Sequence, residues 1–142
     1  MVEQKNSYAG FWLRLVAWII DMLVVMGASI LLGSFLGIVA PNIDLFDSQV
    51  VWDVIGFATV WLYFTVMESS SKQGTLGKMA LGIFVTDMDG NRISFARANG
   101  RYFGKILSEL ILGFGYVMIA FTEKKQALHD KLAGCLVLKK QK

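Results

Sequence analysis

The chain of 142 residues has few of the side chains that build metal sites, disulfides and tight turns, because it contains one cysteine, one histidine and one proline. The lone Cys135 excludes a disulfide within the chain, and the lone His129 argues against a histidine-based metal site. Charged residues make up only 18% of the chain, whereas soluble domains average about 25%. We therefore expect no metal, no cofactor and no soluble globular domain.

Hydrophobic residues, in contrast, are abundant at 55%, and the mean hydropathy is +0.53. The formal net charge is +3, and the basic residues flank apolar runs instead of forming a stripe on a polar face. That placement is typical of a protein oriented in a membrane, with contacts to anionic lipid headgroups. Membrane lipid is the expected partner, and nucleic acid is not.

Two apolar runs are long enough to cross a membrane, at residues 11–40 and 50–67, since a span needs about 20 residues. We do not interpret the first run as a signal peptide, because it is too long and contains Arg14 and Asp21. A third run, at 101–121, is interrupted by glycines at 113 and 115. The predicted fold class is an all-α integral membrane protein, a single domain over 1–142, with two transmembrane helices and a third, glycine-broken segment.

Orientation follows from the loops. The segment between the first two runs has two aspartates and no lysine or arginine, whereas residues 68–100 carry several basic residues. Cytoplasmic loops are enriched in lysine and arginine. We therefore place the N-terminus and the 68–100 loop in the cytoplasm, at the plasma (inner) membrane. Within this loop, residues 82–86 and 93–95 flank an Asp-Gly turn, which predicts a small β-hairpin.

The third run leaves two topologies open. If it spans the membrane, the lysine-rich tail of residues 122–142 lies outside, against the usual charge bias. If the glycine break turns the run back as a re-entrant segment, the tail returns to the cytoplasmic side, and the backbone must be covered by protein. We favour the re-entrant alternative, and we expect a short strand at 135–138.

Arg14 and Asp21 are the most informative charges, because a charge at a helix centre costs about 2.5–3.5 kcal/mol on insertion scales. Seven residues apart, they share one helix face but lie about 10 Å apart along the axis. Each therefore needs a partner from another segment. Two interpretations stay open: a proton or cation pathway, or structural ion pairs.

Arg101, Lys105 and Glu109 follow at helical spacing in the third run. This stripe could face Asp21 across the bundle, with Glu109 as a second carboxylate for proton transfer. The alternative is an amphipathic helix that lies partly in the membrane interface.

Several other patterns have a functional and a structural interpretation. Ser29, Gly33 and Gly37 form a series of small residues that allows close helix packing, within the chain or between copies. The string at 74–78, Gly-Thr-Leu-Gly-Lys, resembles part of a phosphate loop, but its spacing is wrong. We interpret it as a turn with a basic anchor at the headgroups. Asp53 is expected to be an exposed cap or interfacial charge.

The pair His129-Asp130 could act as an acid and base, but no nucleophile accompanies it in a known motif. Asp130 more plausibly pairs with an arginine such as Arg14, and Cys135 is expected to be a packed, small hydrophobic residue. An enzyme is therefore not expected.

Taken together, the motifs resemble the RDD family of membrane proteins, named for one arginine and two aspartates. The resemblance rests on residues 11–21 with Arg14 and Asp21, on 74–78, on 82–90, on Arg101 and on 128–134, where Asp130 is the second aspartate. Cys135 departs from the threonine that is more usual in the family. The resemblance implies a poorly defined function: transport has been proposed, some members resemble Na⁺(Li⁺,K⁺)/H⁺ antiporters, and fusion to other domains suits a scaffold.

The sequence is therefore consistent with two functions. The first is transport, including Na⁺(Li⁺,K⁺)/H⁺ antiport, with Asp21 as the titrating group. Three short segments are too few to enclose a path, so transport would need a homo-oligomer. The second is a membrane scaffold or a lipid- or partner-binding module, in which Arg14, Asp21 and Asp130 are structural.

Overall fold

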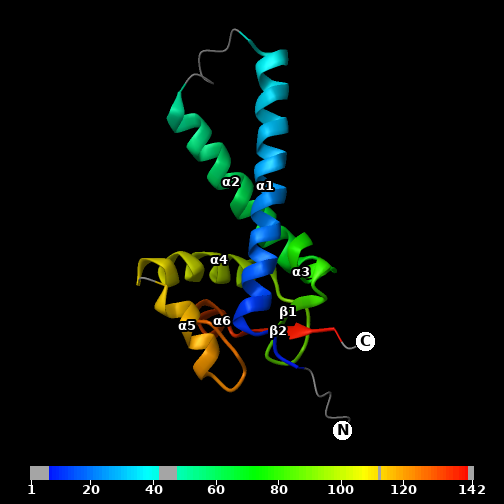
Figure 1. Cartoon of the computed structure of the whole chain (residues 1–142), viewed down its shortest axis with the longest axis vertical. Coiled ribbons are helices and arrows are strands. Elements are labelled where there is room, and N and C mark those ends of the chain that lie inside the picture. The colour runs from blue at the N-terminus through cyan, green and yellow to red at the C-terminus, as the bar shows by residue number, and fades with distance from the viewer. Residues whose placement is uncertain (1–6, 42–47, 112, 141–142) are drawn as a thin grey trace.

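The computed structural model describes residues 7–41, 48–111 and 113–140. Within them lie the helices and strands α1 (Phe11–Val39), α2 (Gln49–Ser69), α3 (Leu76–Ala80), β1 (Ile83–Asp87), α4 (Phe95–Leu110), α5 (Phe114–Phe121), α6 (Leu128–Ala133) and β2 (Cys135–Lys139). Figure 1 shows α1 and α2 projecting together from a base that holds all the other elements. The two predicted transmembrane helices are confirmed, since α1 and α2 are both long and apolar enough to cross a membrane.

Helix α1 is longer than a bilayer requires. Its 29 residues extend about 44 Å, whereas the hydrocarbon core is about 30 Å thick. The first turns lie within the base, where Ala17 and Asp21 are buried, and the later turns expose large apolar side chains such as Ile30, Leu31 and Ile38. The helix stops at Val39, just before Pro41.

The predicted β-hairpin is wrong, although its turn and its first strand are present. Strand β1 pairs in antiparallel register with β2, from Ile83 opposite Lys139 to Asp87 opposite Cys135. The expected second strand at 93–95 instead begins a helix, because the Ser94 hydroxyl accepts a hydrogen bond from the amide of Arg97, 3.1 Å away, and caps α4. The strand predicted near the C-terminus is confirmed as β2.

The third apolar run is a bent pair of helices, α4 and α5, whose axes differ by 104°. The break contains Gly113, whose φ of +76° is a left-handed conformation that favours glycine. Figure 1 shows α4 lying across the view below α2, level with the first turns of α1, and α5 turning away from its end. Since two paired strands must lie on one side of a membrane, the β1–β2 pairing favours the re-entrant alternative over a third span.

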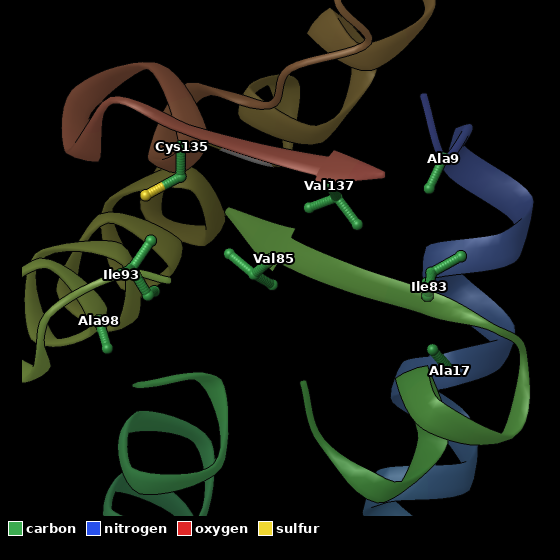
Figure 2. Close-up of a cluster of buried hydrophobic side chains, with 8 residues drawn as sticks. All are labelled: Ala9, Ala17, Ile83, Val85, Ile93, Ala98, Cys135 and Val137. Atoms are coloured by element: carbon green, nitrogen blue, oxygen red, sulfur yellow. The ribbon is translucent and has the colours of Figure 1, made fainter. Parts of the chain in front are cut away.

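A small apolar core joins the β1–β2 sheet to the beginning of α1 and to α4. Figure 2 shows Ala9 and Ala17 at one end of this cluster and Ile93 and Ala98 at the other. The remaining members come from the two strands: Ile83, Val85, Cys135 and Val137. Tyr8 also bridges to Leu138. The base is therefore tied to the beginning of α1 by apolar packing and by backbone hydrogen bonds.

Candidate functional site

Arg14, near the beginning of α1, contacts three other parts of the base. Its guanidinium forms an ion pair with Asp130 of α6. It also donates from Nε to the carbonyl of Ala9 at 3.0 Å, and from Nη2 to the carbonyl of Lys125 at 2.6 Å. The side chain is only 11% exposed. The predicted pairing of Arg14 with Asp130 is present, and it links the first helix to the C-terminal part of the chain.

Asp130 is fully buried and has a second cationic partner, because Arg101 Nη2 donates to its Oδ1 at 2.8 Å. The amide of Ala127 donates to Oδ2 at 3.1 Å. Burial alone would raise the pKa of Asp130, but Arg101 and Arg14 outweigh that effect and hold it well below its usual range. Asp130 is therefore ionised whenever the fold is intact at ordinary pH.

Glu68, at the end of α2, is a central residue that sequence reasoning missed. Its carboxylate accepts from Arg101 Nη1 at 2.9 Å, pairs with Lys78, and lies 3.5 Å from the ammonium of Lys105. Glu68 is 1% exposed. One sequence signal could have identified Glu68: it is a carboxylate that directly follows an apolar run, in a chain with more basic than acidic residues.

Lys78 is buried, so the prediction that it anchors the 74–78 turn to the headgroups is wrong. It is 7% exposed, and its ammonium pairs with Glu68 inside the protein. Burial lowers the pKa of Lys78 to about 8, against the opposing attraction of Glu68. The pairing ties the 74–78 turn to the end of α2.

These contacts form one connected set of charges, which we call the ion network. Its members are Arg14, Glu68, Lys78, Arg101, Lys105 and Asp130. Helices α1, α2, α3, α4 and α6 each contribute at least one of them. The network contains four cations and two carboxylates, so it has an excess of two positive charges.

Asp21 has a separate environment made of neutral donors. Its carboxylate accepts from the hydroxyl of Tyr63 at 2.8 Å, from the hydroxyl of Thr75 at 2.5 Å and from the amide of Gly77 at 2.8 Å. Asp21 is fully buried, and no ion pair to it occurs within the described residues. The expectation that Asp21 meets a polar partner from another segment is confirmed, but Arg101 and Lys105 face Glu68 instead.

Gly77 explains how these donors reach Asp21. A Cβ atom at Gly77 would lie 2.1 Å from the carbonyl oxygen of Ala17, so only glycine permits this approach of α3 to α1. Tyr63 OH also accepts from the amide of Leu76 at 3.1 Å, which ties α2 to the same turn. The 74–78 segment, which resembles part of a phosphate loop, therefore binds the carboxylate of Asp21 in the same chain.

The other candidate residues lie outside these two clusters. Glu109 is exposed on α4, and Asp53 is exposed on α2, where Gln49 donates to it at 2.9 Å. Of the small-residue series, Gly33 lies against the ring of Trp52, while Ser29 and Gly37 are exposed. Only Gly33 of this series thus contributes to the described packing between α1 and α2.

A cavity of about 410 Å³ opens beside the ion network. Arg14, Lys78, Arg101 and Lys105 line it, together with Asp21, Glu109 and His129. The rest of its wall is apolar: Phe11, Leu15, Trp18, Phe64, Gly113, Tyr116, Val117, Ile119 and Val137. Its wall thus combines the cationic residues of the network with an apolar surface.

His129 and Cys135 are both buried. Burial lowers the pKa of His129 to about 3 and raises the pKa of Cys135 to about 11, so the imidazole and the thiol are both neutral at ordinary pH. The His129 ring packs against Tyr116, with 5.4 Å between ring centroids. Within residues 7–41, 48–111 and 113–140, no group of three or more metal-binding side chains occurs.

The order of these motifs along the chain is that of a known family. The sequence profile of the RDD family matches residues 8–134, which include both clusters. The chain belongs to the RDD family. Arg14, Asp21 and Asp130, the residues expected to give this family its name, are thus all buried or nearly buried in the base.

This RDD chain is similar to two proteins of one bacterium that are named as uncharacterized. It is 35% identical over 148 residues to the uncharacterized protein YxaI of Bacillus subtilis (strain 168), covering 93% of this chain and 97% of the relative. It is 32% identical to the uncharacterized membrane protein YteJ of the same organism, covering 94% and 82%. No solved structure matches the chain. The chain is thus an RDD family membrane protein.

Proposed function

We propose that this RDD chain is a non-enzymatic membrane module whose buried charges hold a folded base onto two transmembrane helices, where it binds lipid or a partner. The observation that carries the proposal is the ion network, which joins five helices through side chains that are almost completely buried. Removing one member of a buried pair typically costs about 3–5 kcal/mol. Charges used in this way are fixed in place, as a scaffold requires.

The test compares ion flux with stability. Purified protein in sealed vesicles should show no pH-driven Na⁺, Li⁺ or K⁺ exchange, measured with a pH-sensitive dye inside the vesicles. Arg14→Ala should lower the free energy of unfolding in detergent by about 3–5 kcal/mol, because Asp130 loses one of its two cations. Lys131→Ala, at an exposed position of α6, is the matched control. Robust exchange by the unsubstituted protein would refute the proposal.

One observation favours cation/proton antiport as the second candidate. Asp21 lines the cavity and is held by three neutral donors from two segments, α2 and the 74–78 turn, so a proton or a monovalent cation could exchange there without breaking an ion pair. A path across the whole membrane would require a homo-oligomer. Under this candidate, Asp21→Asn abolishes exchange in vesicles and leaves the fold intact, and unchanged exchange by that variant would exclude it.

A further inference from the structure

The ion network has more positive charge than its own carboxylates neutralise. Four cations share Glu68 and Asp130, and all four cations line the cavity. Uncompensated charge is costly near hydrocarbon, where the dielectric constant is low. An anion from outside the chain would offset the excess.

Lys105 is the cation with the weakest internal pairing. Its ammonium lies 3.5 Å from Glu68 and 4.4 Å from the centre of the Phe64 ring, and its side chain is 18% exposed, the most of the four. Lysine binds phosphate as a compact point charge with three donors. Its ammonium is therefore the member of the network best placed to meet an anion in the cavity.

A buried donor beside the cavity supports the same conclusion. Among the described residues, Arg101 Nε is buried without a hydrogen-bond partner, and Arg101 lines the cavity. Asp21 and Glu109 also line the cavity, but neither forms an ion pair with a member of the network within the described residues. The network therefore keeps its positive charge on the side of the cavity.

The apolar wall indicates what kind of anion fits. Trp18, which is half exposed, Leu15 and Val117 line the same cavity as the four cations. The exposed apolar side chains Leu107, Leu110 and Phe114 lie on α4 and α5. A free phosphate would leave the apolar wall unused, whereas a lipid offers a phosphate and an acyl chain together.

We infer that this cavity binds one anionic phospholipid, whose headgroup phosphate meets Lys105 and the neighbouring arginines while an acyl chain lies along Trp18. This inference deepens the proposed scaffold function, since it names lipid as the partner. Lipid binding in the cavity does not require the absence of ion exchange. Ion flux in vesicles would therefore refute the proposed scaffold function without refuting lipid binding.

The experiment uses Trp18 as a local reporter. A protein with Trp12, Trp52 and Trp61 replaced by phenylalanine is placed in phosphatidylcholine vesicles that contain brominated phosphatidylglycerol or brominated phosphatidylcholine. Bromine quenches tryptophan only at close range. We expect phosphatidylglycerol to be preferred at Trp18 by at least about fivefold, the factor that one interfacial lysine or arginine contributes.

Two comparisons separate a bound lipid from general enrichment of anionic lipid. Lys105→Gln should reduce the preference about fivefold, whereas Lys131→Gln removes an exposed charge and should leave it unchanged. A protein that keeps only Trp52, beside Gly33 and about 22 Å farther along α1, should show no preference. Equal quenching by the two lipids at Trp18, or an equal effect of the two lysine variants, would overturn the inference.

A second measurement needs no tryptophan replacement, which matters because Trp61 donates to Asn99 at 2.7 Å. Native mass spectrometry of the unsubstituted protein, released from mixed vesicles, should retain one phosphatidylglycerol in preference to phosphatidylcholine. Inorganic phosphate added to phosphatidylcholine samples distinguishes the two sources of phosphate. Adducts of free phosphate without lipid retention would overturn the lipid assignment.

Discussion

The approach of α3 to α1 at Gly77 can be tested with the addition of a single methyl group. In Gly77→Ala, the new Cβ would lie 2.1 Å from the carbonyl oxygen of Ala17 and 2.9 Å from Asp21 Oδ1. The first contact is between backbone-fixed atoms, so no change of rotamer can relieve it. Helix α3 must move away from α1, and the hydrogen bond from the Gly77 amide to Asp21 is then lost.

The magnitude follows from three contributions. Overpacking a tight contact costs about 1–3 kcal/mol. Loss of a hydrogen bond to a charged group costs about 1.5–3 kcal/mol. Alanine in place of glycine in a helix returns about 1 kcal/mol. We expect Gly77→Ala to lower the free energy of unfolding by about 3 kcal/mol.

The assay is unfolding in mixed micelles with increasing SDS, followed by circular dichroism. Gly27→Ala is the matched control, because the same change in α1 places a methyl group where nothing lies within 4 Å. It should be neutral, or stabilising by up to about 1 kcal/mol. If the two variants differ by less than about 0.5 kcal/mol, the tight packing of α3 against α1 is refuted.

Three further predictions use the buried charges and the thiol. Glu68→Gln should lower the free energy of unfolding by about 3–5 kcal/mol, because it removes one member of a buried ion pair. The control Asp53→Asn, at an exposed position, should lower it by less than about 0.5 kcal/mol. Equal losses of stability in SDS titrations would contradict the ion network. The pKa of His129 is lowered to about 3, so the unfolded chain binds a proton that the fold excludes, and stability should fall as the pH drops from about 6.5 towards 3. His129→Phe should flatten that slope, and an unchanged slope would exclude His129 as its source. Cys135 is fully buried, and burial raises its pKa to about 11. Maleimide should therefore label Cys135 rapidly in SDS, which unfolds the protein, and very slowly in mild detergent. Rapid labelling in both would disprove its burial.

Much of the fold could be predicted because hydrophobic length is a local property of the sequence. The runs at 11–40 and 50–67 correspond to α1 and α2, and the glycine break at 113 corresponds to the bend between α4 and α5. The cost of charge in lipid required partners for Arg14 and Asp21, and each has them. These predictions needed no knowledge of how distant segments meet.

The strand pairing could not be predicted in the same way. An Asp-Gly turn between apolar residues favours a local hairpin, but β1 pairs with β2, which is about 50 residues away in the chain. The Ser94 cap commits the next segment to α4, and only the position of the tail beside β1 supplies the second strand. Tertiary contacts, and not the local sequence, therefore determine which strand pairs with β1.

The sequence by itself determined that the chain is a membrane protein with two spans, a broken third segment and buried charges that need compensation. Only the tertiary structure decided which charges meet: Arg14 with Asp130, Arg101 with both Asp130 and Glu68, and Asp21 with neutral donors. The physical reason is range. Hydropathy and backbone propensity act over a few residues, whereas an ion pair depends on the positions of helices that are far apart in the chain.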